Sequence, residues 1–207
     1  GRAENWWGPV GQTGPCGPDT EMFYWTGEEH NSKFGAVCHQ NCDCGRFSEI
    51  WNDVFMQYTK TFDNDYIEMT YKNIDTGLGL ERVLAILNGK QSVFEIETFL
   101  PIIRKIEDLS NKNYTQDAET TRAIRIIADH LRAATFVLGD ENGVTPSNIG
   151  QGYILRRLIR RAIRFGYQLG IKKDFTTEIA RLTVQIFNKF YPELAKNQER
   201  IFQELAL

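Results

Sequence analysis

Residues 75–82, Asp-Thr-Gly-Leu-Gly-Leu-Glu-Arg, combine the side chains and the spacing of a ligand-binding turn. Glycines allow a backbone to approach a ligand closely, and the N-terminus of a helix favours an anion. Arg82 follows at a distance that suits a phosphate clamp, and Asp75 can hold an ammonium group. The spacing is that of neither a Walker nor a Rossmann loop, so a simple helix cap is the alternative interpretation.

A second set of polar and aromatic residues lies on a predicted strand over residues 47–59. Alternation along this strand puts Glu49 and Trp51 on one face and Asn52 on the other, unless a bulge near Asn52 intervenes. Two adjacent tryptophans, Trp6 and Trp7, stand next to a Gly-Pro pair and suggest an aromatic wall. Packing in a hydrophobic core explains these two rings equally well.

Three cysteines, Cys38, Cys42 and Cys44, are clustered with His30 eight residues before them. Zinc takes four tetrahedral nitrogen and sulfur ligands, and this cluster offers three thiols and an imidazole. The spacing of these cysteines differs from the common C-x₂-C pair of zinc sites, and this difference favours inert reduced thiols. Cysteines in a polar loop have little packing role, however, and this favours zinc. Both interpretations stay open, and disulfides are not expected in a chain without a secretory signal.

A predicted helix over residues 148–169 presents one face made of five arginines, which we call the arginine face: Arg156, Arg157, Arg160, Arg161 and Arg164. Apolar side chains from Ile154 to Phe165 occupy the opposite side of this helix. A solvated charged face usually mixes Lys, Arg and Glu, whereas guanidinium groups without a nearby acid favour phosphate. Asn148, just before the helix, can offer its amide to a base edge in the shallow minor groove of RNA, or can cap the helix.

The net charge of −3 is an average over unlike segments. Residues 1–121 carry a net charge of −9, whereas residues 122–164 carry +5. No acidic residue occurs between Glu141 and Asp174. This asymmetry predicts that one segment meets a polyanion while another has a different task.

The elements that position these residues change in type along the chain. Four glycines and three prolines in residues 5–18 predict an irregular loop, followed by strands over 21–26, 47–59 and 66–74 and a helix that ends near residue 88. Apolar residues then recur every three or four positions, which predicts helices over 96–109, 119–138, 148–169, 175–190 and 192–206. Strands before helices predict an α+β fold with domains over 1–92 and 93–207.

The length of 207 residues and the 42% hydrophobic content suit one or two domains with a buried core and exclude a disordered chain. No run of about 20 apolar residues occurs, so no membrane-spanning helix is expected. The N-terminal residues lack the apolar stretch of a signal peptide. We therefore expect a cytoplasmic protein.

Five blocks of the sequence together resemble alanyl-tRNA synthetases, a family of class II aminoacyl-tRNA synthetases. The blocks span nearly the whole chain in the order of the family and cover residues 4–21, 49–57, 75–82, 125–132 and 146–167. The resemblance implies the C-terminal part of an antiparallel-sheet catalytic domain, followed by an all-helical domain that recognises tRNA.

The resemblance also implies roles for residues of the first domain. Residues 75–82 are similar to class II motif 3, which assigns ATP binding to Gly79 and Arg82. The alanine site that it implies consists of a closing tryptophan, two groups that hold the amino group and a glycine that leaves room for the methyl group: Trp7, Asn52, Asp75 and Gly77. Glu49 is a candidate contact for a metal or for ATP, and Glu49 and Arg82 are the implied catalytic residues.

The implied activity is that of an alanine–tRNA ligase. Alanine would be activated with ATP and Mg²⁺ to alanyl-adenylate and then transferred to the 3′ end of tRNA(Ala). Asn148 and Arg160 match positions that reach the G·U pair of the acceptor stem, with the neighbouring arginines on phosphates. The alternative is an RNA-binding fragment without catalytic activity of its own.

The sequence also departs from the family. Family members begin well upstream, with motifs 1 and 2, and carry an editing domain and a C-terminal domain that have no counterpart in these 207 residues. We therefore expect an internal fragment or one half of a split enzyme, whose partner would be the N-terminal half. Taken alone, the chain is expected to be inactive or very weak in adenylation.

Overall fold

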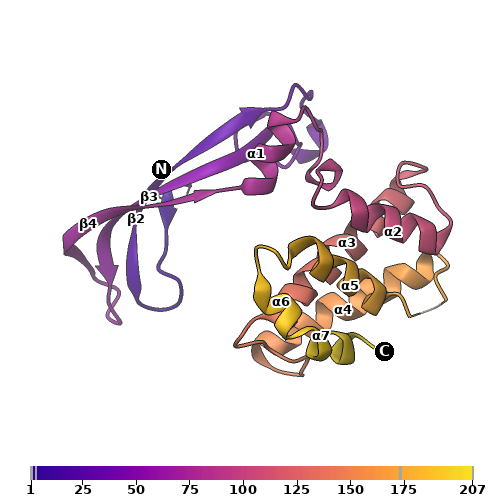
Figure 1. Cartoon of the computed structure of the whole chain (residues 1–207). Coiled ribbons are helices and arrows are strands. Elements are labelled where there is room, and N and C mark those ends of the chain that lie inside the picture. The colour runs from indigo at the N-terminus through magenta and orange to yellow at the C-terminus, as the bar shows by residue number, and fades with distance from the viewer. Residues whose placement is uncertain (1, 3, 173, 207) are drawn as a thin grey trace. The chain divides into compact units, whose positions relative to one another are not determined.

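The computed structural model describes residues 2, 4–172 and 174–206 and divides the chain into two compact units (Figure 1). Gly1–Val93 form the sheet unit, and Phe94–Leu207 form the helical unit. The predicted order of strands followed by helices is confirmed.

The sheet unit is built on a four-stranded antiparallel sheet in the order β1-β2-β3-β4. Its strands are β1 (Trp6–Trp7), β2 (Gly14–Trp25), β3 (Phe47–Lys60) and β4 (Tyr66–Leu78). The prediction that residues 5–18 form only an irregular loop is wrong, because β1 and the first part of β2 fall inside this segment. One of these glycines, Gly17, allows close strand packing: a Cβ on it would lie 1.8 Å from the carbonyl oxygen of Phe55 on β3.

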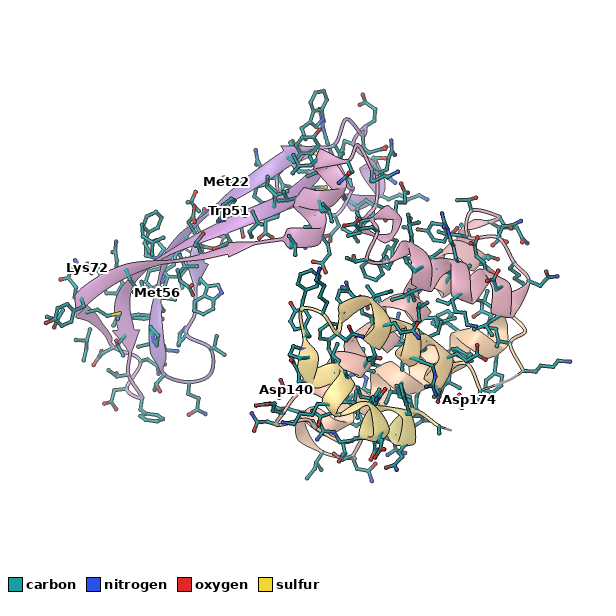
Figure 2. The ribbon with its side chains drawn as sticks, in the orientation of Figure 1. Met22, Trp51, Met56, Lys72, Asp140 and Asp174 are labelled. Atoms are coloured by element: carbon teal, nitrogen blue, oxygen red, sulfur yellow. The ribbon has the colours of Figure 1, made fainter. Side chains whose placement is uncertain are left out.

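A bulge in β3 changes which side chains share a face of the sheet. Met22 pairs with Trp51, as the neighbouring strands in Figure 2 show, but the next residue of β2, Phe23, pairs with Glu49. Ile50 is therefore the extra residue of β3. The bulge predicted near Asn52 thus exists, and strict alternation does not continue from Trp51 to Glu49.

The segment predicted as a glycine turn begins as a strand. Residues 75–78 are the end of β4, paired with β3 so that Val54 opposes Asp75 and Asn52 opposes Gly77. The chain turns at Gly79, whose N–H donates to the carbonyl of Ile50 at 2.9 Å. Helix α1 (Leu80–Leu87) follows at once, so the end of β4 and the first turn of α1 are held next to the bulge.

The helical unit packs around one long helix. Its helices are α2 (Leu100–Ser110), α3 (Ala118–Gly139), α4 (Gly150–Gln168), α5 (Thr176–Phe187), α6 (Pro192–Lys196) and α7 (Gln198–Leu205). Helix α3 contacts each of the others and buries a continuous apolar stripe. The single helix predicted over 192–206 is two helices, divided at Asn197, whose side-chain amide donates to the carbonyl of Gly139 at 2.8 Å.

Two glycines of this core allow close helix contacts. A Cβ on Gly139 would lie 2.4 Å from Leu194 Cδ2, and a Cβ on Gly166 would lie 2.3 Å from Phe175 Cζ. Of the helices in the described part of the chain, none combines the length and the apolar character that crossing a membrane requires.

Candidate functional site

A cluster of polar side chains surrounds Asn52 on one face of the sheet. The amide nitrogen of Asn52 donates to Asp19 Oδ2 at 2.9 Å and to Glu21 Oε1 at 3.3 Å. Pairing places Glu21 and Gly77 on either side of Asn52, and Asp19 and Asp75 on either side of Val54. Since directly paired residues and residues two apart share a face, Asp19, Glu21, Asn52 and Asp75 project together. We call these four residues the Asn52 cluster.

Two acceptors in the Asn52 cluster have no hydrogen-bond partner. Asn52 Oδ1 and Asp19 Oδ1 are buried, and neither accepts a hydrogen bond from any group in the described residues. Buried polar atoms in folded proteins normally have a partner. Two adjacent acceptors suit a ligand group with several N–H donors, such as an ammonium ion.

The charges of the Asn52 cluster also favour a cation. Burial raises the pKa of Glu21, and the negative charge of Glu49 raises it further, while the hydrogen bond from Asn52 partly offsets the effect. A raised pKa means that the protein destabilises the ionised form of this carboxylate. A positive charge bound beside Glu21 would stabilise the ionised carboxylate, so the electrostatics of the site favour a cation.

Gly77 leaves open space next to Asn52. A Cβ built on Gly77 would have no atom of the described residues within 4 Å, apart from its neighbours in the chain. The opening therefore leaves room for a ligand group beside Asn52. Trp7 lies on β1 opposite Gly17 and is partly exposed, and no hydrogen bond or ring contact joins it to the Asn52 cluster within the described part of the chain. Its neighbour Trp6 instead stacks on Tyr58 at 5.8 Å.

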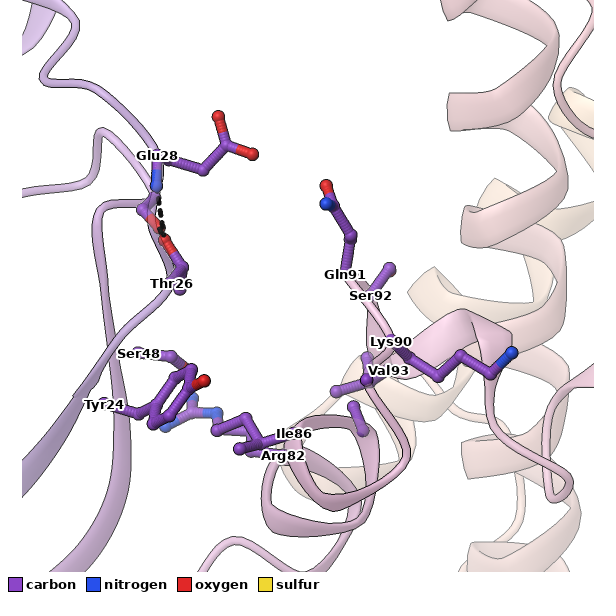
Figure 3. Close-up of a pocket in the computed structure, with 13 residues that line it drawn as sticks. Tyr24, Thr26, Glu28, Ser48, Arg82, Ile86, Lys90, Gln91, Ser92 and Val93 are labelled. Atoms are coloured by element: carbon purple, nitrogen blue, oxygen red, sulfur yellow. Dashed lines mark hydrogen bonds between the residues drawn. The ribbon is translucent and has the colours of Figure 1, made fainter.

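Arg82 stands at the edge of two neighbouring cavities of the sheet unit. Its Nη1 donates to the carbonyl oxygen of Glu49 at 2.7 Å and lies 3.6 Å from the Glu49 carboxylate. One cavity, of about 250 Å³, is lined by Arg82 together with Tyr24, Ser48 and the turn after α1 (Figure 3). Glu49 thus orients a guanidinium group that faces open, polar space, as an anion such as a phosphate requires.

The second cavity, which we call the Glu49 cavity, connects Arg82 with the Asn52 cluster. Glu21, Glu49 and Arg82 line it, and residues 40–43 of the β2–β3 loop form another part of its wall. Asp19, Glu21 and this loop wall were not predicted from the sequence. The acids at positions 19 and 21 share the spacing of one strand face, which is the signal that could have identified them.

The side chains predicted as zinc ligands lie together in the β2–β3 loop. Their ligand atoms, on His30, Cys38, Cys42 and Cys44, all lie within 4.8 Å of one another. All four cysteines of the chain are free thiols. Hydrogen bonds from the His30 side chain and from the backbone N–H of Arg46 lower the pKa of Cys44 to about 6, so this thiol is readily ionised.

The arginine face projects from α4 as predicted, with a narrower apolar side. Its members Arg157, Arg160, Arg161 and Arg164 are exposed and Arg156 is half-buried. The buried residues of α4 are Gly152, Leu155, Ile159, Ala162 and Gly166. Ile154, expected on the packed side, is 53% exposed. Within the described residues, no carboxylate forms an ion pair with the arginine face.

Other arginines of the helical unit are used inside the protein. Arg200 donates to the carbonyl oxygens of Leu138 at 2.8 Å and Asp140 at 2.5 Å, which closes the end of α3. Arg132 lies 3.9 Å from the ring centre of Phe99. The arginine face differs because four of its five arginines are exposed, where their guanidinium groups are available to an external polyanion.

Asn148 is not the cap of α4. The N-cap is Ile149, and no side chain caps this helix end. Instead, Arg156 Nη1 donates to Asn148 Oδ1, and Ser147 Oγ donates to the carbonyl of Ile149 at 2.9 Å. The exposed amide of Asn148 is therefore tied to the arginine face.

Comparison with known proteins gives one consistent family. The sequence model described as "tRNA synthetases class II (A)" matches residues 1–207. The alanine–tRNA ligase of Borreliella afzelii is 50% identical over 202 residues, which are 98% of this chain and 34% of that protein. The alanine–tRNA ligase of Treponema pallidum is 48% identical over 205 residues, 99% of this chain and 33% of its own length. That of Dehalococcoides mccartyi is 42% identical over 206 residues, 100% of this chain and 23% of its own length. The chain thus spans about a third of these relatives, or less.

Proposed function

Because the chain belongs to the class II tRNA synthetase family and is similar to its alanine–tRNA ligases, we propose that it carries part of an ATP-dependent alanine–tRNA ligase. In this proposal the sheet unit binds alanine and ATP, and the helical unit binds the acceptor stem of tRNA(Ala). The enzyme would act in the cytoplasm, where tRNA is charged.

The alanine site is the Asn52 cluster with the space above Gly77. The ammonium group of alanine donates to Asn52 Oδ1 and Asp19 Oδ1, and Asp75 adds a second negative charge on the same face. The alanine methyl group points toward Gly77, and Trp7 closes the pocket. The observation that carries this assignment is the pair of buried acceptors without partners next to the open space above Gly77.

The ATP site is the region around Arg82 and the turn at Gly79. Arg82 is held by Glu49 and supplies a positive charge to the phosphates. Glu21 and Glu49 are carboxylates that line one cavity, which is the donor chemistry that Mg²⁺ prefers, and the ion would add positive charge to that of Arg82.

In this proposal the reaction consists of two successive displacements. The alanine carboxylate attacks the α-phosphorus of ATP and pyrophosphate leaves, which gives alanyl-adenylate. The terminal ribose hydroxyl of the tRNA then attacks the carbonyl carbon, and AMP leaves. Arg82 and the Asn52 cluster contribute by holding the reactants in line and by balancing charge.

The helical unit binds the acceptor stem through the arginine face. Guanidinium groups without protein carboxylates donate to phosphates and hold the stem in position. Asn148 and Arg160 reach the base edges of the shallow minor groove, where an amide can distinguish a G·U pair from a G·C pair.

Calorimetric titration with a non-hydrolysable alanyl-adenylate analogue tests the sheet unit. We expect the alanyl analogue to bind and the valyl analogue to bind at least about tenfold more weakly, because the added methyl groups exceed the pocket. Asn52→Ala should abolish binding. Asp53→Asn is the matched control, because Asp53 accepts from Thr76 Oγ1 at 2.6 Å on the other face of β3. Equal affinity for both analogues would exclude the alanine site.

Binding of acceptor-stem minihelices tests the helical unit. A G·U minihelix should bind more tightly than its G·C counterpart, and Asn148→Ala should remove the difference. Equal affinities with the unaltered chain would leave Asn148 and Arg160 with phosphate contacts only. RNA binding combined with failure to bind the alanyl analogue would support the alternative function, an RNA-binding module without a catalytic role.

A further inference from the structure

The β2–β3 loop, residues 26–46, holds three thiols and an imidazole in one small volume. Cys38 Sγ lies 3.8 Å from Cys44 Sγ, and Cys42 Sγ lies 3.8 Å from His30 Nδ1. We propose that His30, Cys38, Cys42 and Cys44 form a structural zinc site that folds this loop and fixes the loop wall of the Glu49 cavity.

The distances fit tetrahedral coordination. Sulfur ligands at about 2.3 Å from a zinc ion are separated by tetrahedral edges of about 3.8 Å, and a nitrogen ligand shortens its edge to about 3.6 Å. The Cys38–Cys44 and Cys42–His30 separations are both 3.8 Å, and no pair among the four ligand atoms exceeds 4.8 Å. Small side-chain rotations therefore suffice to place all four atoms around one ion.

His30 is already oriented as a ligand. Its Nε2 lies 2.9 Å from the carbonyl oxygen of Gly35. A carbonyl only accepts, so Nε2 donates in this bond, and Nδ1 is the ring nitrogen left for a metal, which would displace the proton that Nδ1 donates to Cys44. Nδ1 is the atom that faces Cys42 Sγ. Histidine ligands of metals commonly have their second nitrogen fixed by such a carbonyl.

The loop has little apolar material to hold it together. Between β2 and β3, Cys42 is the buried residue, while the large apolar side chains Phe34 and Val37 are 50% and 77% exposed. Its regular structure is one short 3₁₀ turn, Ser32–Phe34. Ordering about twenty residues costs conformational entropy that this small burial does not offset. A bound metal supplies the missing stabilisation.

The ligand set selects the class of metal. Three thiolates and one imidazole are soft to borderline donors, which suit zinc, whereas magnesium and calcium require oxygen ligands. All four positions are filled by protein atoms, so no position is left for a substrate. Closed four-ligand sites of this kind are structural.

The proposed metal site lies next to the Glu49 cavity and would affect the shape of its wall. Gln40, Asn41 and Asp43 lie between the ligands and line the Glu49 cavity together with Arg82. Fixing Cys38, Cys42 and Cys44 fixes the residues between them. The importance of this wall for ATP rests on the proposed function, whereas the metal site itself does not.

Elemental analysis of the purified chain tests the site directly. We expect close to one zinc per chain, and loss of zinc in Cys42→Ser and Cys44→Ser. His39→Gln is the matched control, because His39 is in the same loop but outside the set of four. Less than about 0.1 zinc per chain, a threshold set by the tight binding of structural sites, would overturn the proposal. A different metal in its place, or loss of zinc in His39→Gln, would overturn the assignment as well.

A cobalt titration keeps the test valid if the serine variants do not fold. The unaltered chain is stripped with a chelator and titrated with Co²⁺, and an intense absorption of tetrahedral thiolate coordination should saturate at one equivalent. Absence of this absorption would refute the site. Limited proteolysis then tests the wall: zinc should protect residues 26–46, and equal cleavage with and without zinc would refute the claim that zinc folds the loop. None of these readouts depends on alanine, ATP or RNA.

Discussion

Removing two arginines from the arginine face should change the salt dependence of RNA binding by a predictable amount. Four of its members, Arg157, Arg160, Arg161 and Arg164, are exposed. If each neutralises one phosphate, the slope of log K against log salt is about −3.6, so that raising salt from about 50 to about 200 mM weakens binding by about 150-fold. The double variant Arg157→Gln/Arg161→Gln keeps two contacts, which gives a slope of about −1.8 and a loss of about 12-fold.

Fluorescence anisotropy with a labelled acceptor-stem minihelix measures this slope over a series of salt concentrations. The matched control is Arg104→Gln/Arg181→Gln, which removes the same charge from exposed positions on α2 and α5. The control should keep the steep slope. If the control flattens the slope as much as the test variant does, the RNA responds to the net charge of the unit, and the assignment of the arginine face as the binding surface is wrong.

Three further outcomes are expected. Gly77→Val should leave the fold intact, because the space above Gly77 is open, but should abolish calorimetric binding of the alanyl-adenylate analogue; a variant that still binds it would disprove the methyl pocket. Gly166→Ala should cost about 1–3 kcal/mol in urea unfolding, because the new methyl group meets the Phe175 ring, and Phe175→Leu should restore part of the loss; an unchanged midpoint would contradict the close packing. The backbone N–H and the hydroxyl of Thr120 lower the pKa of Asp117, so this cap stabilises the fold above the usual aspartate pKa and the stabilisation is lost as the pH falls below it. Asp117→Ala should therefore be less stable than the parent near neutral pH, and the difference should close in acid; a pH-independent difference would count against the cap.

The order of the elements was predictable because periodicity is a local property of the sequence. The apolar spacing of α3 and α4 can be recognised within these two segments alone, and the arginine face follows from the same helical period. The division at Asn197 was missed because it depends on a tertiary contact, the hydrogen bond from its amide to Gly139. The prediction of a loop over residues 5–18 was wrong for a similar reason, because Gly17 is required there by a close tertiary contact with β3.

The types of residue in the candidate site were predictable from the sequence, but the strand register that brings them together was not. Asn52 and Asp75 were identified as site residues, whereas Asp19 and Glu21 were not. Their proximity to Asn52 depends on which residue of β2 opposes which residue of β3, and nothing local in the sequence specifies that pairing. The bulge was predicted near Asn52, but its exact position at Ile50 depends on the same pairing, and this one extra residue decides whether Glu49 faces the cavity of Glu21.

Strand β4 is an edge strand of the sheet, and an unpaired edge affects how the protein behaves in solution. Within the described residues it pairs with β3 alone, and Tyr71 and Ile74 on it are 86% and 59% exposed. A long strand with exposed apolar side chains is a template for another backbone, so we expect two copies at high concentration to pair along it. Asp75 and Gly77 belong to the same strand, and self-association would therefore bring foreign side chains against the Asn52 cluster. We therefore expect the apparent affinity for the alanyl analogue to fall as protein concentration rises, and values extrapolated to dilution to describe the pocket itself.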